Sequence, residues 1–119
     1  MGNDTLLGGD GSDTYSIDVL TDVIVENAGE GLNDTVNVAL SLVGTYTLAT
    51  NVERAVIANA TAGVNLTGNT LDNVLTGNDT ANSLNGSTGN DSLIGAAGND
   101  TLDGGTGNDT LAGGLGDDV

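Results

Sequence analysis

GSTGNDSLIGAAGNDTLDGGTGNDTLAGGLGDDV, residues 86–119, repeats one pattern every nine residues. An aspartate recurs at the same place in each unit, at Asp91, Asp100, Asp109 and Asp118. A glycine lies two residues before each aspartate, and in all units but the last a leucine lies two residues after it. Each unit therefore combines a glycine turn, one carboxylate and one apolar side chain that can be buried.

The backbone of such a unit can alternate between a tight turn and a very short strand. Glycines reach positive φ without a Cβ clash, so a stretch such as GGTGND, residues 104–109, can coil tightly and turn its carbonyls inward. The three residues that follow, 110–112, are enough for a strand with one side chain facing inward, because strand side chains alternate. Stacked units of this kind bury a column of leucines, as in repeat architectures.

The turn also favours one kind of metal ion. A carboxylate beside several carbonyls is a hard oxygen donor set, which suits Ca²⁺ with roughly six to eight ligands at about 2.3–2.6 Å. The chain has no His and no Cys, so zinc, copper and iron sites of the usual kinds are excluded. Mg²⁺ is disfavoured because it gives up its water reluctantly. We therefore expect the chain to bind several calcium ions.

These units resemble a known family. The nonapeptides of residues 86–112, together with GGDGSDTYS at residues 8–16 and the partial GNDTL at residues 2–6, are similar to the GGxGxDxUx repeat of the RTX, or haemolysin-type, calcium-binding proteins. The resemblance implies an all-β fold, a right-handed parallel β-roll (β-solenoid) in which two nonapeptides make one coil. It also implies that Ca²⁺ lies between vertically adjacent turns.

The resemblance further implies which residues hold the ions. Carboxylates eighteen residues apart would face each other, Asp91 with Asp109 and Asp100 with Asp118. Turn carbonyls would complete the sites, at Ser87, Gly89, Ala96, Gly98, Gly105, Gly107, Gly114 and Gly116. This residue-by-residue correspondence holds only in the C-terminal block. One more site in the N-terminal repeat is a separate hypothesis: Asp13 has Asp4 before it and Asp22 after it at the nine-residue step, and its metal-binding residues would be Asp4, Gly9, Gly11 and Asp13. We expect two well-formed sites in the C-terminal block, with half sites at its ends.

Upstream of residue 86 the pattern continues in part. Inward leucines keep the nine-residue step, at Leu66, Leu75 and Leu84. Asn73 and Asn82 occupy the aspartate position, and asparagine is a neutral acceptor that tolerates turns. The coils of residues 64–85 are therefore predicted to continue the solenoid with weak or absent calcium binding. A half site that pairs Asn73 with Asp91, or Asn82 with Asp100, stays open.

Residues 17–63 form an irregular, strand-rich insert. The nonapeptide is lost there, but short β-branched runs recur at residues 22–25, 34–38, 46–48 and 52–57, separated by turn residues. We expect a solenoid throughout; a separate subfold is the alternative. The chain is predicted to be one domain, residues 1–119, divided into N-terminal repeats (1–16), the insert (17–63), asparagine-substituted coils (64–85) and the calcium-binding block (86–119).

The charge of the chain limits its partners. The formal net charge is −16, and Arg54 is the single basic residue. Such a chain is poorly suited to nucleic acid, whose affinity depends on Lys and Arg, and to anionic membrane surfaces. No apolar run approaches the length that membrane insertion requires. Without calcium the composition favours disorder, so we expect folding to depend on bound metal.

The resemblance also implies a biological setting. RTX proteins are exported by type I secretion from Gram-negative bacteria, unfolded in the low-calcium cytosol and folded outside the cell. We therefore expect an extracellular module, secreted or at the cell surface, that supports the secretion, folding and spacing of a larger protein. Its partners would be calcium ions, the rest of the parent polypeptide and, through open solenoid ends, a second copy of itself.

Two other functions are less favoured. The chain is not expected to be an enzyme, because without His, Cys or Lys catalysis would depend on carboxylates whose spacing marks them as ligands; a calcium-assisted enzyme fragment acting on polysaccharides is the weakest alternative. An ice- or surface-binding adhesin segment is the other. Its motivation is a set of residues eighteen apart that would form ladders, Thr70, Thr88 and Thr106 with Asn90 and Asn108. Threonine and asparagine are also common turn residues, which is the simpler explanation.

Overall fold

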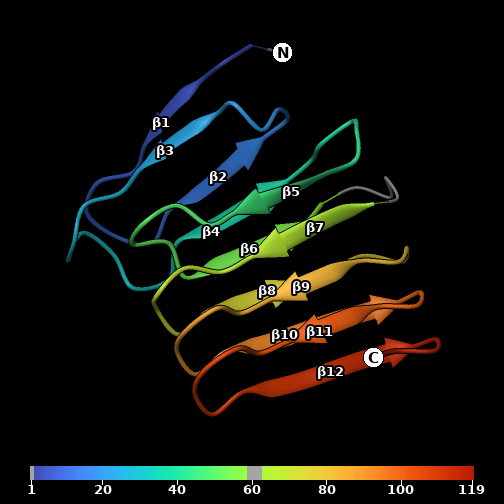
Figure 1. Ribbon diagram of the computed structural model, residues 1–119. Helices are drawn as coiled ribbons and strands as arrows, with labels where there is room; N and C mark the ends of the chain where they lie inside the picture. The colour runs from blue at the N-terminus through green and yellow to red at the C-terminus, as the bar shows by residue number, and fades with distance from the viewer. Residues whose placement is uncertain (1, 59–62) are drawn as a thin grey trace.

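The computed structural model describes residues 2–58 and 63–119, and these residues form short β-strands without a helix (Figure 1). The described residues accordingly hold no helix with the length and hydropathy that a membrane crossing would require. The strands are β1 (Thr5–Leu7), β2 (Thr14–Ile17), β3 (Val23–Val25), β4 (Thr35–Val38), β5 (Gly44–Thr47), β6 (Arg54–Ile57), β7 (Val64–Thr67), β8 (Val74–Thr76), β9 (Ser83–Asn85), β10 (Ser92–Ala97), β11 (Thr101–Asp103) and β12 (Thr110–Leu115).

The strands pair in parallel with strands of the next coil. One sheet has the order β12-β10-β8-β6-β4-β2, a second has the order β11-β9-β7-β5, and β1 pairs with β3. From β4 onward, successive strands alternate between the two long sheets, so the chain winds as a coil. Figure 1 shows these coils stacked in one direction, with the N- and C-termini at opposite ends of the stack. The predicted all-β parallel β-roll is therefore confirmed, as a β-solenoid of about six turns.

The coil length agrees with two nonapeptides per turn in the C-terminal half. Leu93 pairs with Leu75 on one side and with Leu111 on the other, and stacked residues there are 18 apart. The coils from β2 to β8 are longer, with contacts between stacked residues 21, 19 and 20 apart, whereas stacked residues of β1 and β3 are again 18 apart. The strands β4, β5 and β6 of the irregular insert nevertheless lie in the same two sheets as the repeats. Strand β3 differs, because it pairs only with β1.

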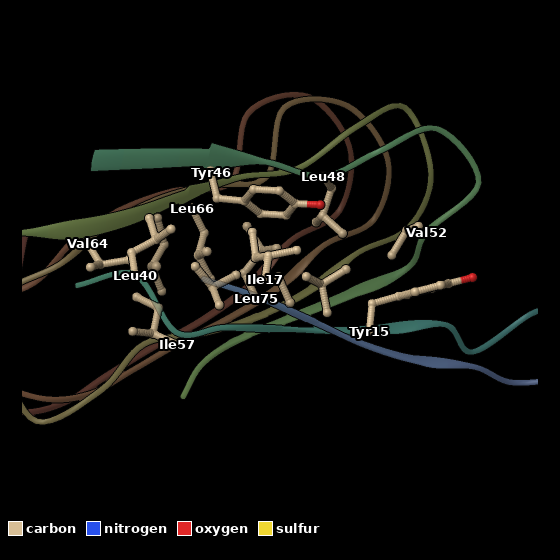
Figure 2. Close-up of a cluster of buried hydrophobic side chains, with 14 of the residues drawn as sticks. Tyr15, Ile17, Leu40, Tyr46, Leu48, Val52, Ile57, Val64, Leu66 and Leu75 are labelled. Carbon is tan, nitrogen blue, oxygen red and sulfur yellow. The ribbon is translucent and has the colours of Figure 1, made fainter. Parts of the chain in front are cut away.

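Alternation along these strands builds one continuous core. The inward leucines Leu66, Leu75, Leu84 and Leu93 are 0–1% exposed, which confirms the predicted column for these four. Leu102 is partly buried, and the column ends at β12, the edge strand of its sheet, where the predicted burial of Leu111 is wrong. Valine and isoleucine take the inward positions in the longer coils, and both tyrosines join the same cluster (Figure 2). Figure 2 shows Tyr15 extending away from the other labelled side chains, with its hydroxyl at the outer edge of the cluster. In the last coil, Leu111 is 48% exposed.

Candidate metal sites

The predicted facing aspartates stack one above the other. Parallel pairing of β10 with β12 aligns the residues that precede them, so the Asp91 N–H donates to Asp109 Oδ1 at 2.9 Å. On the other edge of the solenoid the Asp100 N–H donates to Asp118 Oδ1, also at 2.9 Å. One carboxylate oxygen of each lower aspartate is thus used to join two coils.

In the upper aspartates, Asp91 and Asp100, one carboxylate oxygen is buried and accepts no hydrogen bond from the part of the chain that the structure describes. Asp91 and Asp100 are 2% and 1% exposed, and Oδ2 of each has no hydrogen-bond partner among the described residues. Burial raises the pKa of Asp91; the Asp109 and Asp72 charges act in the same direction, against a lowering by the Asn73 N–H. A buried, unpaired carboxylate oxygen is unfavourable unless a cation or proton meets it.

Glycines keep space open beside these oxygens. A Cβ built on Gly86 would overlap Asp91 Oδ2 and would lie 2.5 Å from the carbonyl oxygen of Gly104 in the next coil. A Cβ on Gly95 would overlap Asp100 Oδ2 and the next coil's carbonyl in the same way. Carboxylate and carbonyl oxygens therefore surround a space that a side chain would fill. This oxygen-only donor set, with its orphaned carboxylate oxygens, fits Ca²⁺.

The predicted carbonyl positions also stack in pairs. A Cβ on the lower glycine of each pair would overlap the carbonyl oxygen of the upper residue. All of these residues have positive φ, including the two that are not glycine, which marks them as turn positions of one repeated geometry. The pairs are Ser87 with Gly105, Gly89 with Gly107, Ala96 with Gly114 and Gly98 with Gly116. The structure brings the predicted turn residues together; their role as ligands remains a prediction.

In the asparagine coils an uncharged side chain takes the place of the buried carboxylate, and each asparagine hydrogen-bonds to the coils on both sides. The Asn82 N–H donates to Asp100 Oδ1 at 2.8 Å, as the aspartates do to the coil below them. Its own side-chain amide donates from Nδ2 to the Val64 carbonyl at 2.8 Å. Asn73 likewise stacks on Asp91 at 2.7 Å. An amide thus donates to a carbonyl of the coil above, as a carboxylate could not. The structure stacks Asn73 on Asp91 and Asn82 on Asp100, and ion binding at these half sites stays a prediction.

The N-terminal aspartates lie in separate stacks. The Asp4 N–H donates to Asp22 Oδ1 at 3.0 Å at an exposed position, and this contact is the main cause that lowers the pKa of Asp22. The Asp13 N–H donates to Asp34 Oδ1 at 2.8 Å. The structure therefore does not bring Asp4 and Asp13 together. The predicted turn residues Gly9 and Gly11 both have positive φ, at 97° and 120°.

Two acidic residues beside Asp13, Glu26 and Asp34, were not predicted from the sequence as candidate ligands. Ligand atoms of Asp13, Glu26 and Asp34 all lie within 4.8 Å of one another. A signal for Asp34 was present, because Gly29 lies five residues before it, the spacing that also separates Gly8 from Asp13. Glu26 has no counterpart in the repeat, and only the folded chain places it there.

The stacked turns and the oxygen-only donors define a calcium-binding β-solenoid module. In agreement, the family model of the RTX calcium-binding nonapeptide repeat (4 copies) matches residues 2–16, 67–102 and 85–119, more than half of the chain. The chain belongs to this family, whose repeats bind calcium and are structural, not enzymatic. A search of curated proteins and a search of solved structures each found no match to the chain.

Proposed function

We propose that this chain is a calcium-dependent folding module of a larger secreted protein. The observation that carries the proposal is the pair of buried oxygens, Asp91 Oδ2 and Asp100 Oδ2, which lack hydrogen-bond partners and lie beside turn carbonyls of the next coil. Several Ca²⁺ ions would occupy the stacked turns of residues 86–119. Their ligands would be the four predicted aspartates and the turn carbonyls paired above.

Calcium binding would be coupled to folding. The sites join residues 18 apart, so they exist only when two coils are stacked. A ligand that binds only the folded state stabilises it by mass action. With a formal net charge of −16, the metal-free fold also suffers repulsion that bound cations relieve. Both effects make calcium the switch between a disordered chain and the solenoid.

Such a switch suits a protein that crosses from a calcium-poor to a calcium-rich compartment. RTX repeats occur in secreted bacterial proteins. The chain would leave a Gram-negative bacterium unfolded by type I secretion and fold outside, where it would space and support the remainder of the parent polypeptide. The open last coil, where Leu111 is 48% exposed, offers a surface for that polypeptide or for end-to-end contact with another copy.

Circular dichroism with chelated protein tests the proposal. Titration with Ca²⁺ is expected to produce a cooperative coil-to-β transition that Mg²⁺ at the same concentration does not produce. The double variant Asp91→Asn/Asp109→Asn should require more calcium, whereas Asp10→Asn/Asp79→Asn, which removes the same number of charges at exposed positions, should not. A chelated protein that is already fully β, with a spectrum unchanged by calcium, would overturn the proposal.

The ice- or surface-binding alternative receives less support. Thr88 and Thr106 do form a parallel bridge between coils, and both are exposed. However, the Asn108 N–H donates to Asn90 Oδ1 at 3.0 Å, so the Asn90 side chain joins two coils. The asparagine ladder therefore has a structural use. Inhibition of ice recrystallisation by the calcium-loaded protein would restore this alternative.

A further inference from the structure

Three acidic side chains converge at the N-terminal end of the solenoid. Asp13 precedes β2 and Asp34 precedes β4; parallel pairing of these strands stacks the two aspartates, with the Asp13 N–H bonded to Asp34 Oδ1 at 2.8 Å. Glu26 follows β3 and reaches the same place from a different part of the coil. Glu26 Oε2 accepts a hydrogen bond from the Tyr15 hydroxyl, and Asn51 Nδ2 donates to the Glu26 backbone carbonyl at 2.9 Å.

Each of the three carboxylates keeps one buried oxygen without a partner. Glu26 is 7% exposed and Asp34 is 0% exposed. Among the described residues, Asp13 Oδ2, Glu26 Oε1 and Asp34 Oδ2 are buried and accept no hydrogen bond. Ligand atoms of the three residues lie within 4.8 Å of one another, so three acidic groups share one small volume. Carboxylates this close repel one another, and a cation between them would relieve that repulsion and meet the unused oxygens.

Two glycines keep the volume open. A Cβ on Gly8 would overlap the Tyr15 hydroxyl first, then Glu26 Oε2 and Asp13 Oδ2. A Cβ on Gly31 would overlap the Gly11 carbonyl oxygen and lie 2.6 Å from Asp34 Oδ2. The Gly11 carbonyl oxygen thus lies on the Asp34 side of the cluster. The resulting donors are all oxygen, as a hard cation requires.

We propose that Asp13, Glu26 and Asp34 form a separate site for one hard cation, Ca²⁺ in the natural setting. Arg54 is the chain's single basic side chain, it is exposed, and among the described residues no ion pair joins it to these carboxylates. A bound divalent ion would meet three unused oxygens at once. It would also tie β3, which pairs only with β1, to the longer sheet.

This site differs from those of the C-terminal block in composition and in independence. It has three carboxylates, one of them a glutamate outside the repeat, and a higher ligand charge favours tighter binding of hard cations. Glu26 and Asp34 lie outside the residues that the repeat family matches. The site does not rest on the proposed calcium sites of residues 86–119, and either could fail while the other holds.

Terbium luminescence tests the site directly. Tb³⁺ is a hard cation that takes oxygen ligands, and a tyrosine close to it sensitises its emission. The chain has no Trp and two Tyr, of which Tyr15 contacts the ligand Glu26. We expect tyrosine-excited Tb³⁺ emission from the full chain that Ca²⁺ displaces. Glu26→Gln, which keeps the length of the side chain and an acceptor for Tyr15, should weaken Tb³⁺ binding by about tenfold or more.

Three controls separate the outcomes. Asp10→Asn, an exposed aspartate of the same repeat, should leave affinity and emission unchanged. Tyr15→Phe leaves all three carboxylates in place. It should therefore remove most of the sensitised emission, while the Tb³⁺ affinity measured by calorimetry persists. This variant tests whether Tb³⁺ binds beside Tyr15 even if Glu26→Gln does not fold. Asp100→Asn should impair the C-terminal sites and spare the Tyr15-sensitised signal. Unchanged emission in Tyr15→Phe, or unchanged Tb³⁺ affinity in folded Glu26→Gln, would overturn the proposal.

Discussion

Replacing Asp100 by asparagine should shift the metal-free and the calcium-bound protein in opposite directions. Asp100 is 1% exposed; its Oδ1 accepts the Asn82 N–H at 2.8 Å and its Oδ2 has no partner. An asparagine keeps the first contact and replaces the second oxygen by an N–H donor. Asn82 shows that such a donor finds a carbonyl of the coil above, because its Nδ2 bonds the Val64 carbonyl at 2.8 Å.

The magnitudes follow from these contacts. A buried polar group without a partner destabilises by about 1–3 kcal/mol, so its removal should stabilise the metal-free fold by that amount. One calcium site at a free concentration of about 100 times its Kd stabilises the fold by about 2.7 kcal/mol, and the variant should lose most of this contribution. The variant should therefore fold more readily without calcium and respond less to it.

Two titrations followed by far-UV circular dichroism measure the two effects. In chelator, folding is driven by trimethylamine N-oxide, which favours burial of surface, and Asp100→Asn should need less of it than the wild type. Without the osmolyte, the calcium midpoint should rise. Asp79→Asn, an exposed aspartate, is the charge-matched control and should move both midpoints little. If Asp100→Asn needs more osmolyte and more calcium alike, the carboxylate is an ordinary hydrogen-bond acceptor and the metal-site argument is refuted.

Three further predictions concern space, core and pH. Gly86→Ala should raise the calcium concentration at the midpoint of folding because its Cβ would overlap Asp91 Oδ2, whereas Gly2→Ala, with its nearest neighbouring atom 3.9 Å away, should not. Equal effects of the two variants would contradict the proposed ion-binding space beside Asp91. Leu84→Ala should destabilise by about 2–5 kcal/mol in urea unfolding with calcium, against little change for Leu42→Ala, since these leucines are 0% and 78% exposed. Burial raises the pKa of Tyr46 from 10.0 to about 12, so its neutral form contributes stability that is present below pH 10 and lost as the pH rises through about 12; Tyr46→Phe should raise the midpoint of alkaline unfolding followed by circular dichroism, and an unchanged midpoint would contradict this assignment.

The fold was predictable wherever a period could be counted. The nine-residue step fixes which leucines face inward and, with two units per coil, which residues stack. Asp91 on Asp109 and Asp100 on Asp118 follow from it directly. The short strands of the insert were also visible as β-branched runs, and β4 and β6 begin within one or two residues of two of those runs. A local signal is sufficient when each coil repeats its neighbour.

The parts that were missed depend on contacts between segments of unequal length. The coil from Asp13 to Asp34 spans 21 residues, so no fixed step relates its members. Glu26 enters the acidic cluster only because β3 leaves the long sheets and the Tyr15 hydroxyl meets the side chain that follows it. The pairing of β3 with β1 is likewise set by tertiary contacts and not by the local sequence. Sequence periodicity carries no information on such an encounter.

The distribution of aspartate and asparagine along the stack has a consequence for how calcium acts. In the central coils, Asn82 and Asn73 donate their amides to backbone carbonyls or to a neighbouring side chain, and the inward leucines are fully buried. Among the described residues of these coils, no buried carboxylate oxygen lacks a hydrogen-bond partner. The unpartnered oxygens of Asp91 and Asp100 lie toward one end of the stack, and that of Glu26 lies toward the other.

Since the central coils lack a buried charge that calls for neutralisation, their stacking depends least on metal. Coils on either side extend the same sheets only by bringing carboxylates into the interior, a step that is unfavourable until a cation is bound. If calcium drives folding as proposed, we expect it to act on the growth of the solenoid outward from its centre more than on the first contacts within it. Because each end has carboxylates of its own, we expect the two ends to order at different calcium concentrations, so that the length of the ordered solenoid would depend on the ion.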